Sequence, residues 1–224
     1  MNEVELNIGR SQEAALSVNK VVRNTYMLLS MTLLFSTVAA VASMALQLSQ
    51  GMGFMLLLGG FLMSFVVRAT ANSSKGLVSV FVFAGLMGAA LGPTISVYLV
   101  AYTNGSAIVA QALGGTALIF LSLSGYALTT GKSFNFLGGF IFTGMMVVMV
   151  AMIANIFLQI PALSLALSAA VILLMSGFIL YDTGRIINGG ERNYIMATIS
   201  LYLSIFNLFV HLLHLIAAFS GNRD

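Results

Sequence analysis

Seven long apolar segments follow one another along the chain, with only short polar stretches between them. A helix needs about 20 predominantly apolar residues to cross the roughly 30 Å hydrocarbon core of a bilayer. In lipid, only helices and closed barrels satisfy all their backbone hydrogen bonds. The segments therefore predict an all-α integral membrane protein, a seven-transmembrane helix bundle. Their expected bounds are Tyr26–Leu48, Gly51–Arg68, Gly76–Leu99, Ala107–Thr129, Phe134–Phe157, Ala162–Tyr181 and Tyr194–Phe219.

Charge is scarce in this chain: 7% of its residues are charged and 59% are hydrophobic. A soluble domain carries about 25% charged residues, so this chain could not cover itself with a soluble surface. The basic residues never form a run, which argues against nucleic acid as a partner. The absence of cysteine excludes disulfides, thiolate metal sites and cysteine nucleophiles.

The first apolar segment contains Ala40-Val41-Ala42, which has the form of a signal-peptide cleavage site. The stretch before it is long and carries three glutamates, and the apolar run continues past it to Leu48. We therefore expect the first segment to be retained as a transmembrane helix.

The basic residues segregate to one side of the membrane if the chain crosses it seven times. Eight of the nine lie before the first segment or around the second-to-third, fourth-to-fifth and sixth-to-seventh connections, and the ninth is Arg223. Because cytoplasmic loops are enriched in Lys and Arg, the N-terminus is expected in the cytoplasm and the C-terminus outside. The expected division is a flexible cytoplasmic tail of residues 1–24, a bundle of residues 25–220 and a short external tail of residues 221–224.

Two ionisable residues lie at the ends of apolar segments, where a charge is costly and therefore a functional candidate. Asp182 ends the sixth segment and Arg68 ends the second, so both are expected near the cytoplasmic surface. One hypothesis is that they pair across the bundle as a proton-sensitive latch that closes a pore. The alternative is that both charges simply extend to water at the interface.

The seventh segment carries a polar face. Its members recur at spacings of four, three, four and three residues, which places them on one side of a helix; they are Ser200, Ser204, Asn207, His211 and His214. Such a face cannot meet lipid cheaply, so the seventh helix is expected at the centre of the bundle. The face is interpreted either as a lining for ions, protons or water, or as hydrogen bonding between packed helices.

Metal and enzyme chemistry have little support in the sequence. Two histidines without a nearby acid give a weak metal signal, so we expect no metal site and no cofactor. The chain has no His-Glu-x-x-His, P-loop or Gly-x-Ser-x-Gly motif. Asp182 is the only acid expected inside the membrane, so a pair of catalytic aspartates for proteolysis is not available. We expect no catalytic residues and no enzyme activity.

Small residues recur every fourth position in the third segment, at Ala84, Gly88 and Gly92. Such a spacing allows the backbones of two helices to approach closely. We expect this face of the third helix to pack against a neighbouring helix.

Four stretches near the C-terminus are distinctive; in chain order they are Tyr181-Asp182-Thr183, Gly189-Gly190-Glu191, Asn193-Tyr194 and Leu201–Phe209. They resemble the transmembrane Bax-inhibitor-motif family. Three further stretches, Lys20–Tyr26, Leu113–Leu118 and Ala154–Leu163, are similar to a bacterial branch whose members modulate the membrane-anchored AAA+ protease FtsH. The resemblance covers nearly the whole chain from Lys20.

The resemblance implies a seven-helix bundle with the seventh helix central. Some members of the family are pH-gated calcium leak channels, in which an acid at the end of the sixth span pairs with a second acid in the seventh and an arginine of the second participates. Asp182 and Arg68 match two of these positions, but the second acid falls on Ser204. In such a pair, each negative charge raises the pKa of the other carboxyl group. A single carboxylate without a close acidic partner does not have its pKa raised in this way.

The resemblance to the bacterial branch implies an inner-membrane regulator that binds FtsH, together with regulators associated with the protease, in membrane-protein quality control. FtsH engages flexible cytoplasmic tails, and the polar first 20 residues or so are consistent with one. The alternative implied by the wider family is a pH-sensitive calcium or proton leak.

Overall fold

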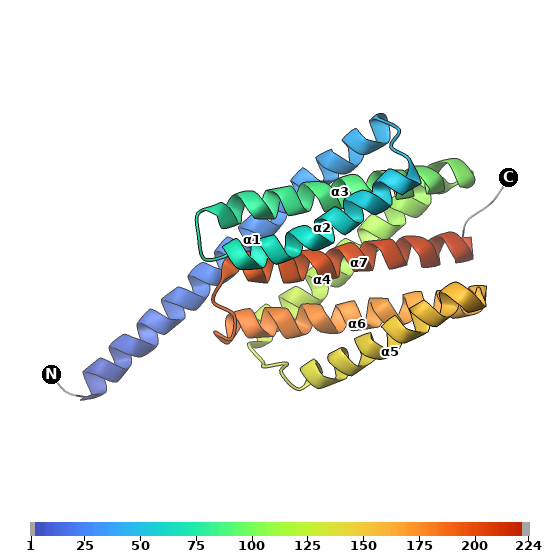
Figure 1. The fold of residues 1–224 in the computed structure, drawn as a ribbon. Coiled ribbons are helices and arrows are strands. Elements are labelled where there is room, and N and C mark those ends of the chain that lie inside the picture. The colour runs from blue at the N-terminus through green and yellow to red at the C-terminus, as the bar shows by residue number, and fades with distance from the viewer. Residues whose placement is uncertain (1–2, 221–224) are drawn as a thin grey trace.

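The computed structural model describes residues 3–220, and within them the chain folds as seven helices without strands (Figure 1). The helices are α1 (Glu3–Ala45), α2 (Gln50–Thr70), α3 (Lys75–Ala101), α4 (Gly105–Thr130), α5 (Leu137–Leu158), α6 (Pro161–Ile187) and α7 (Tyr194–Ser220). All seven are long and apolar enough to cross a membrane. This confirms the predicted all-α membrane architecture and its seven spans. The bounds agree within about three residues, except at the start of α1 and the end of α6.

The first helix is longer than its membrane-spanning part. The apolar span begins at Val18, whereas α1 begins at Glu3 and projects beyond the rest of the bundle (Figure 1). A flexible tail was expected for residues 1–24, but the segment from Glu3 onward is helical. The span supplies a ready nucleus, so the costly first turn is avoided, and strong helix formers such as Ala14 and Ala15 favour extension. The division into tail and bundle stays a prediction, and the predicted external tail of residues 221–224 lies outside the described residues.

Two groups of helices flank α7. On one side α1, α2 and α3 pack together, and on the other α6 packs between α5 and α7. Figure 1 shows α7 running between α2 and α6. In all, α7 packs against α1, α2, α3, α4 and α6, the neighbours that a central helix would have.

The contact between α1 and α3 depends on small residues, as the sequence predicts. A Cβ added to Gly88 would fall on the carbonyl oxygen of Ser36, and one added to Gly92 would fall on the hydroxyl of Ser43. The Ser36 hydroxyl also meets the Tyr202 hydroxyl of α7 at 2.6 Å. The glycines of α3 therefore allow the close approach of α3 to α1, and the same stretch of α1 also bonds to α7.

Candidate functional site

A cavity of about 470 Å³ lies where α2 and α6 end and α7 begins, the end expected to face the cytoplasm. Its polar lining comes from three helices, the α2–α3 turn and the α6–α7 loop, and consists of Arg68, Asn72, Asp182, Arg185, Glu191, Asn193 and Ser200. Two cations and two anions therefore surround one cavity, and two of these four charged residues are the sequence-predicted Asp182 and Arg68.

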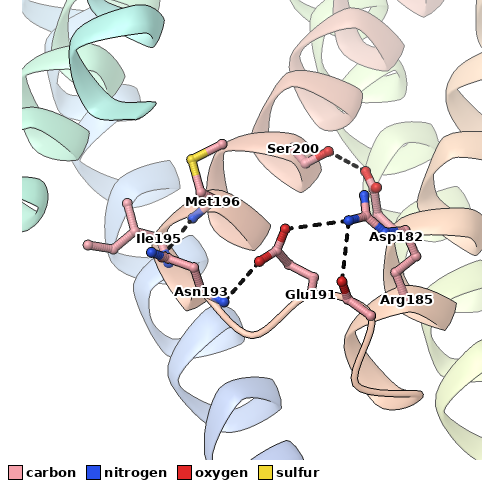
Figure 2. Close-up of polar contacts among 8 residues, drawn as sticks. Asp182, Arg185, Glu191, Asn193, Ile195, Met196 and Ser200 are labelled. Carbon is pink, nitrogen blue, oxygen red and sulfur yellow. Dashed lines mark hydrogen bonds and ion pairs between the residues drawn. The ribbon is translucent and has the colours of Figure 1, made fainter. Parts of the chain in front are cut away.

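Asp182 is a buried residue, with only 6% of its surface exposed, and its carboxylate accepts a hydrogen bond from the hydroxyl of Ser200 (Figure 2). The sequence prediction placed Asp182 at the end of the sixth span, but α6 continues to Ile187. The stop signals are Asn188, which bonds back to the helix, and Gly189, whose φ of 72° is the left-handed conformation that ends helices. Asp182 consequently lies more than one turn inside the helix.

Arg68 faces the same cavity from the last turn of α2, and its side chain is exposed. Among the side chains of residues 16–220, the one ion pair joins Arg185 to Glu191 at 3.7 Å, so Arg68 and Asp182 share the cavity without forming an ion pair. Their action as a latch stays a prediction.

Arg185 and Glu191 were not singled out as site residues from the sequence. The guanidinium of Arg185 lies 5.6 Å from the centre of the Tyr181 ring and donates to the carbonyl of Gly190 at 3.4 Å. The other oxygen of Glu191 accepts from the backbone N–H of Asn193 at 2.9 Å. These contacts fix the α6–α7 loop over the cavity (Figure 2). Their positions depend on the loop conformation, which no spacing in the sequence reveals.

Asn193 joins the start of α7 to the α2–α3 turn. Its side-chain oxygen caps the start of α7 by accepting from the N–H groups of Ile195 at 2.9 Å and Met196 at 3.3 Å. Its amide nitrogen donates to the carbonyl of Ala71 at 3.1 Å and to the side-chain oxygen of Asn72 at 2.7 Å. An asparagine directly before an apolar helix is a readable capping signal. Its bonds to the α2–α3 turn carry no such signal.

The polar face of α7 is directed toward α6 at both of its ends. Ser200 meets Asp182 at one end, and at the other the rings of His211 and His214 each contact Ser168 of α6 at 3.2 Å. The middle residues bond within α7: Ser204 donates to the carbonyl of Ser200 at 3.2 Å and Asn207 to that of Leu203 at 2.8 Å.

Ser204, at the position where the resemblance implies a second acid, is 97% buried, since only 3% of its surface is exposed. Its hydroxyl is satisfied within its own helix, so the Asp182 carboxylate has a single hydroxyl partner. Calcium takes six to eight oxygen ligands in proteins. Within residues 3–220, no cluster of three or more His, Cys, Asp or Glu residues is close enough to hold a metal ion.

Sequence comparisons identify relatives over nearly the whole chain. The family model Bax1-I, inhibitor of apoptosis-promoting Bax1, matches residues 18–221. The modulator of FtsH protease YccA from Escherichia coli K12 is 50% identical over 201 residues, which are 90% of this chain and 91% of that protein. An uncharacterized membrane protein of Vibrio cholerae is 47% identical over 213 residues, 95% of each chain. The inner membrane protein YccA of a second Escherichia coli strain is 50% identical over the same share of the chain.

Proposed function

The chain belongs to the Bax1-I family of membrane proteins, and from this premise we propose that it binds and modulates the FtsH protease in a bacterial inner membrane. The observation that carries the proposal is the 50% identity to a relative named as a modulator of FtsH protease, over 90% of this chain. The family model matches residues 18–221, which include all seven membrane spans. The role is that of a regulator and requires no catalytic residue of its own.

The N-terminal extension of α1 is the proposed handle for the protease. The stretch from Glu3 to Val18 precedes the membrane span and would extend about 22 Å as a helix. Under the orientation expected from the basic residues, it enters the cytoplasm, where a AAA+ protease works. We infer that FtsH binds this segment but cannot readily extract the apolar bundle from the membrane. The protease then stays bound to this chain and degrades other substrates more slowly.

Co-purification tests the proposal. Tagged full-length chain and a variant without residues 1–19 would be crosslinked in membranes that contain FtsH, and the FtsH recovered with each would be measured. We expect recovery with the full chain and a loss of at least about tenfold with the truncated one, equal to about 1.4 kcal/mol of binding. Asp182→Asn serves as a matched control with an intact N-terminus. Absence of FtsH from the full-length sample, in detergent and in crosslinked membranes alike, contradicts the proposal.

A second proposal is the pH-sensitive calcium or proton leak, favoured by the cavity that Asp182 and Arg68 share. Ser204 weighs against it, because this position holds no acid that could pair with Asp182. Purified protein in liposomes would be assayed for calcium flux, with Ser204→Asp as the variant that restores the acid. Flux in the wild type that Asp182→Asn abolishes supports the leak. Flux in the variant alone indicates a family pore that Ser204 disables in this chain.

A further inference from the structure

A hydroxyl and two imidazoles meet between α6 and α7, in the half of the bundle opposite Asp182. The Nδ1 atoms of His211 and His214 each lie 3.2 Å from the Oγ of Ser168. Ser168 is 98% buried, since only 2% of its surface is exposed, and both histidines are partly exposed. His214 lies six residues before the end of α7, about 9 Å along the helix, so the bulk solvent beyond that end is near.

The hydrogen bonding of this trio is constrained by the number of protons available. A serine hydroxyl donates one hydrogen bond and accepts others, and a neutral imidazole carries a proton on one of its two nitrogens. All three groups are satisfied when one imidazole donates from Nδ1 to Oγ and Oγ donates to the Nδ1 of the other. The two imidazoles must then be opposite tautomers, one protonated at Nδ1 and the other at Nε2.

The first and second protons added to this arrangement have different consequences. The first adds to the free Nε2 of the imidazole that already donates from Nδ1, and no hydrogen bond in the trio breaks. The second must add to the Nδ1 that accepts from Ser168, so it displaces the serine proton and breaks that bond. It also creates two positive charges three residues apart on one helix, a repulsive spacing that the low dielectric of a bilayer makes worse.

The surroundings offer no negative charge that would offset a second proton. Among the side chains of residues 16–220, α5 carries no ionisable group, and those of α1, α2, α4 and α6 lie near the opposite end of the bundle; they are Lys20, Arg23, Tyr26, Arg68, Tyr126, Tyr181, Asp182 and Arg185. On α3, Lys75 lies at that same end. Tyr98 of α3 and Tyr102 just after it lie nearby, in a cluster with Phe209 and Leu213, on the opposite side of α7 from the histidines.

We propose that Ser168, His211 and His214 form a proton-binding site that takes its first proton without breaking a hydrogen bond and takes its second only by breaking the bond from Ser168 that joins α6 to α7. The inference goes beyond the proposed role toward FtsH and does not depend on it. The same pair of helices carries the Asp182–Ser200 bond, eleven residues away along α7 or about 16 Å. The second proton at the trio therefore weakens the contact between the two helices that also line the cavity.

Nuclear magnetic resonance of histidine nitrogens tests the proposal on the full chain in nanodiscs. With ¹⁵N-labelled histidine, we expect one Nδ1–H and one Nε2–H imidazole near neutral pH. On acidification we expect two protonation steps separated by more than about one pH unit, the separation typical of strongly coupled sites. His211→Gln and His214→Gln should each leave one imidazole with a single step.

Ser168→Ala removes the hydroxyl, and both imidazoles should then take the same tautomer. Ser168→Thr keeps a hydroxyl and should restore the opposite tautomers, which separates loss of the bond from loss of the fold. Ser204→Ala is the matched control, because this buried serine lies on the same face without touching either histidine. Identical tautomers in the wild type, or a single step in which both imidazoles titrate together, would overturn the proposal.

Discussion

At the residue scale, the central feature is a buried carboxylate with one hydroxyl partner. The burial of Asp182 between α6 and α7 leaves Ser200 as the group that satisfies it, while Ser204 bonds within its own helix. A buried charged or polar group that loses its partner incurs its full desolvation cost, which exceeds the net contribution of the bond. The pair is therefore expected to matter more for stability than the exposed hydroxyls elsewhere on the helices.

We predict that Ser200→Ala destabilises the protein by about 1–3 kcal/mol, because the Asp182 carboxyl is left without its donor. Thermal or denaturant unfolding in detergent measures the change. Ser30→Ala is the control: Ser30 is exposed and bonds to the carbonyl of Tyr26 in its own helix. The double variant Ser200→Ala with Asp182→Asn should lose less than the two single losses added together. Equal effects of Ser200→Ala and Ser30→Ala would contradict this account of the pair.

The sequence predicted Asp182, Arg68 and the α7 face because an ionisable or polar residue in an apolar segment is conspicuous. It did not predict Asn193, Glu191 or Arg185 as members of the same cavity. Their place depends on how the α6–α7 loop turns after Gly189, and a loop conformation is not encoded in periodicity. For the same reason Ser168 was not recognised as the partner of both histidines: a lone serine in an apolar segment has no pattern of its own.

At the element scale, the packing of α3 against α1 depends on positions where a side chain has no room. Gly88 faces backbone atoms of Ser36, which cannot move aside as a flexible side chain would. Gly114 of α4 provides the contrast, since a Cβ added there would meet nothing within 4 Å. A larger residue therefore has no room at Gly88 but has room at Gly114, and the sequence alone does not distinguish the two glycines.

We predict that Gly88→Ala destabilises the protein by about 1–3 kcal/mol, because overpacking forces the two backbones apart. Gly114→Ala is expected to be neutral or to stabilise by up to about 1 kcal/mol, since alanine is the better helix former. Unfolding midpoints of both variants in the same detergent provide the comparison. Equal destabilisation by the two substitutions would contradict the close approach of α1 and α3.

The bounds of the elements show where sequence reasoning ends. The lengths of the apolar segments located every helix, because a helix must have a minimum number of apolar residues to cross the bilayer. The predicted bounds were wrong at two helix ends. The helix α6 continues past its apolar segment to Ile187, and α1 begins before its apolar segment, at Glu3. The hydrophobicity of the sequence indicates which part of a helix lies in the lipid. It does not indicate how far the helix continues outside the membrane.

At the scale of the whole molecule, the distribution of basic residues predicts which end of the bundle faces the cytoplasm. The cavity with Asp182 and Arg68 lies at that end, and the trio of Ser168, His211 and His214 lies toward the other. The two sites are therefore expected to meet different compartments. Orientation decides whether FtsH can reach the extension of α1.

The chain has no cysteine, so single cysteines can report orientation without a background. We predict that Ser106→Cys, near the start of α4, reacts with a membrane-impermeant maleimide in intact spheroplasts. Ser133→Cys, in the α4–α5 loop, should react only after the membrane is permeabilised. Both side chains are exposed, so burial does not explain a difference between them. The reverse pattern of labelling would place the N-terminus outside and remove the proposed handle from the protease.

The most direct test of the central claim is the rate at which FtsH degrades a membrane substrate in proteoliposomes. The full chain would be added at a stoichiometric excess over FtsH, and the variant without residues 1–19 would be added in parallel. The account predicts that the full chain slows degradation at least about tenfold, while the truncated chain leaves the rate close to that of FtsH alone. An unchanged rate with the full chain, in liposomes where crosslinking detects it beside FtsH, would contradict the account.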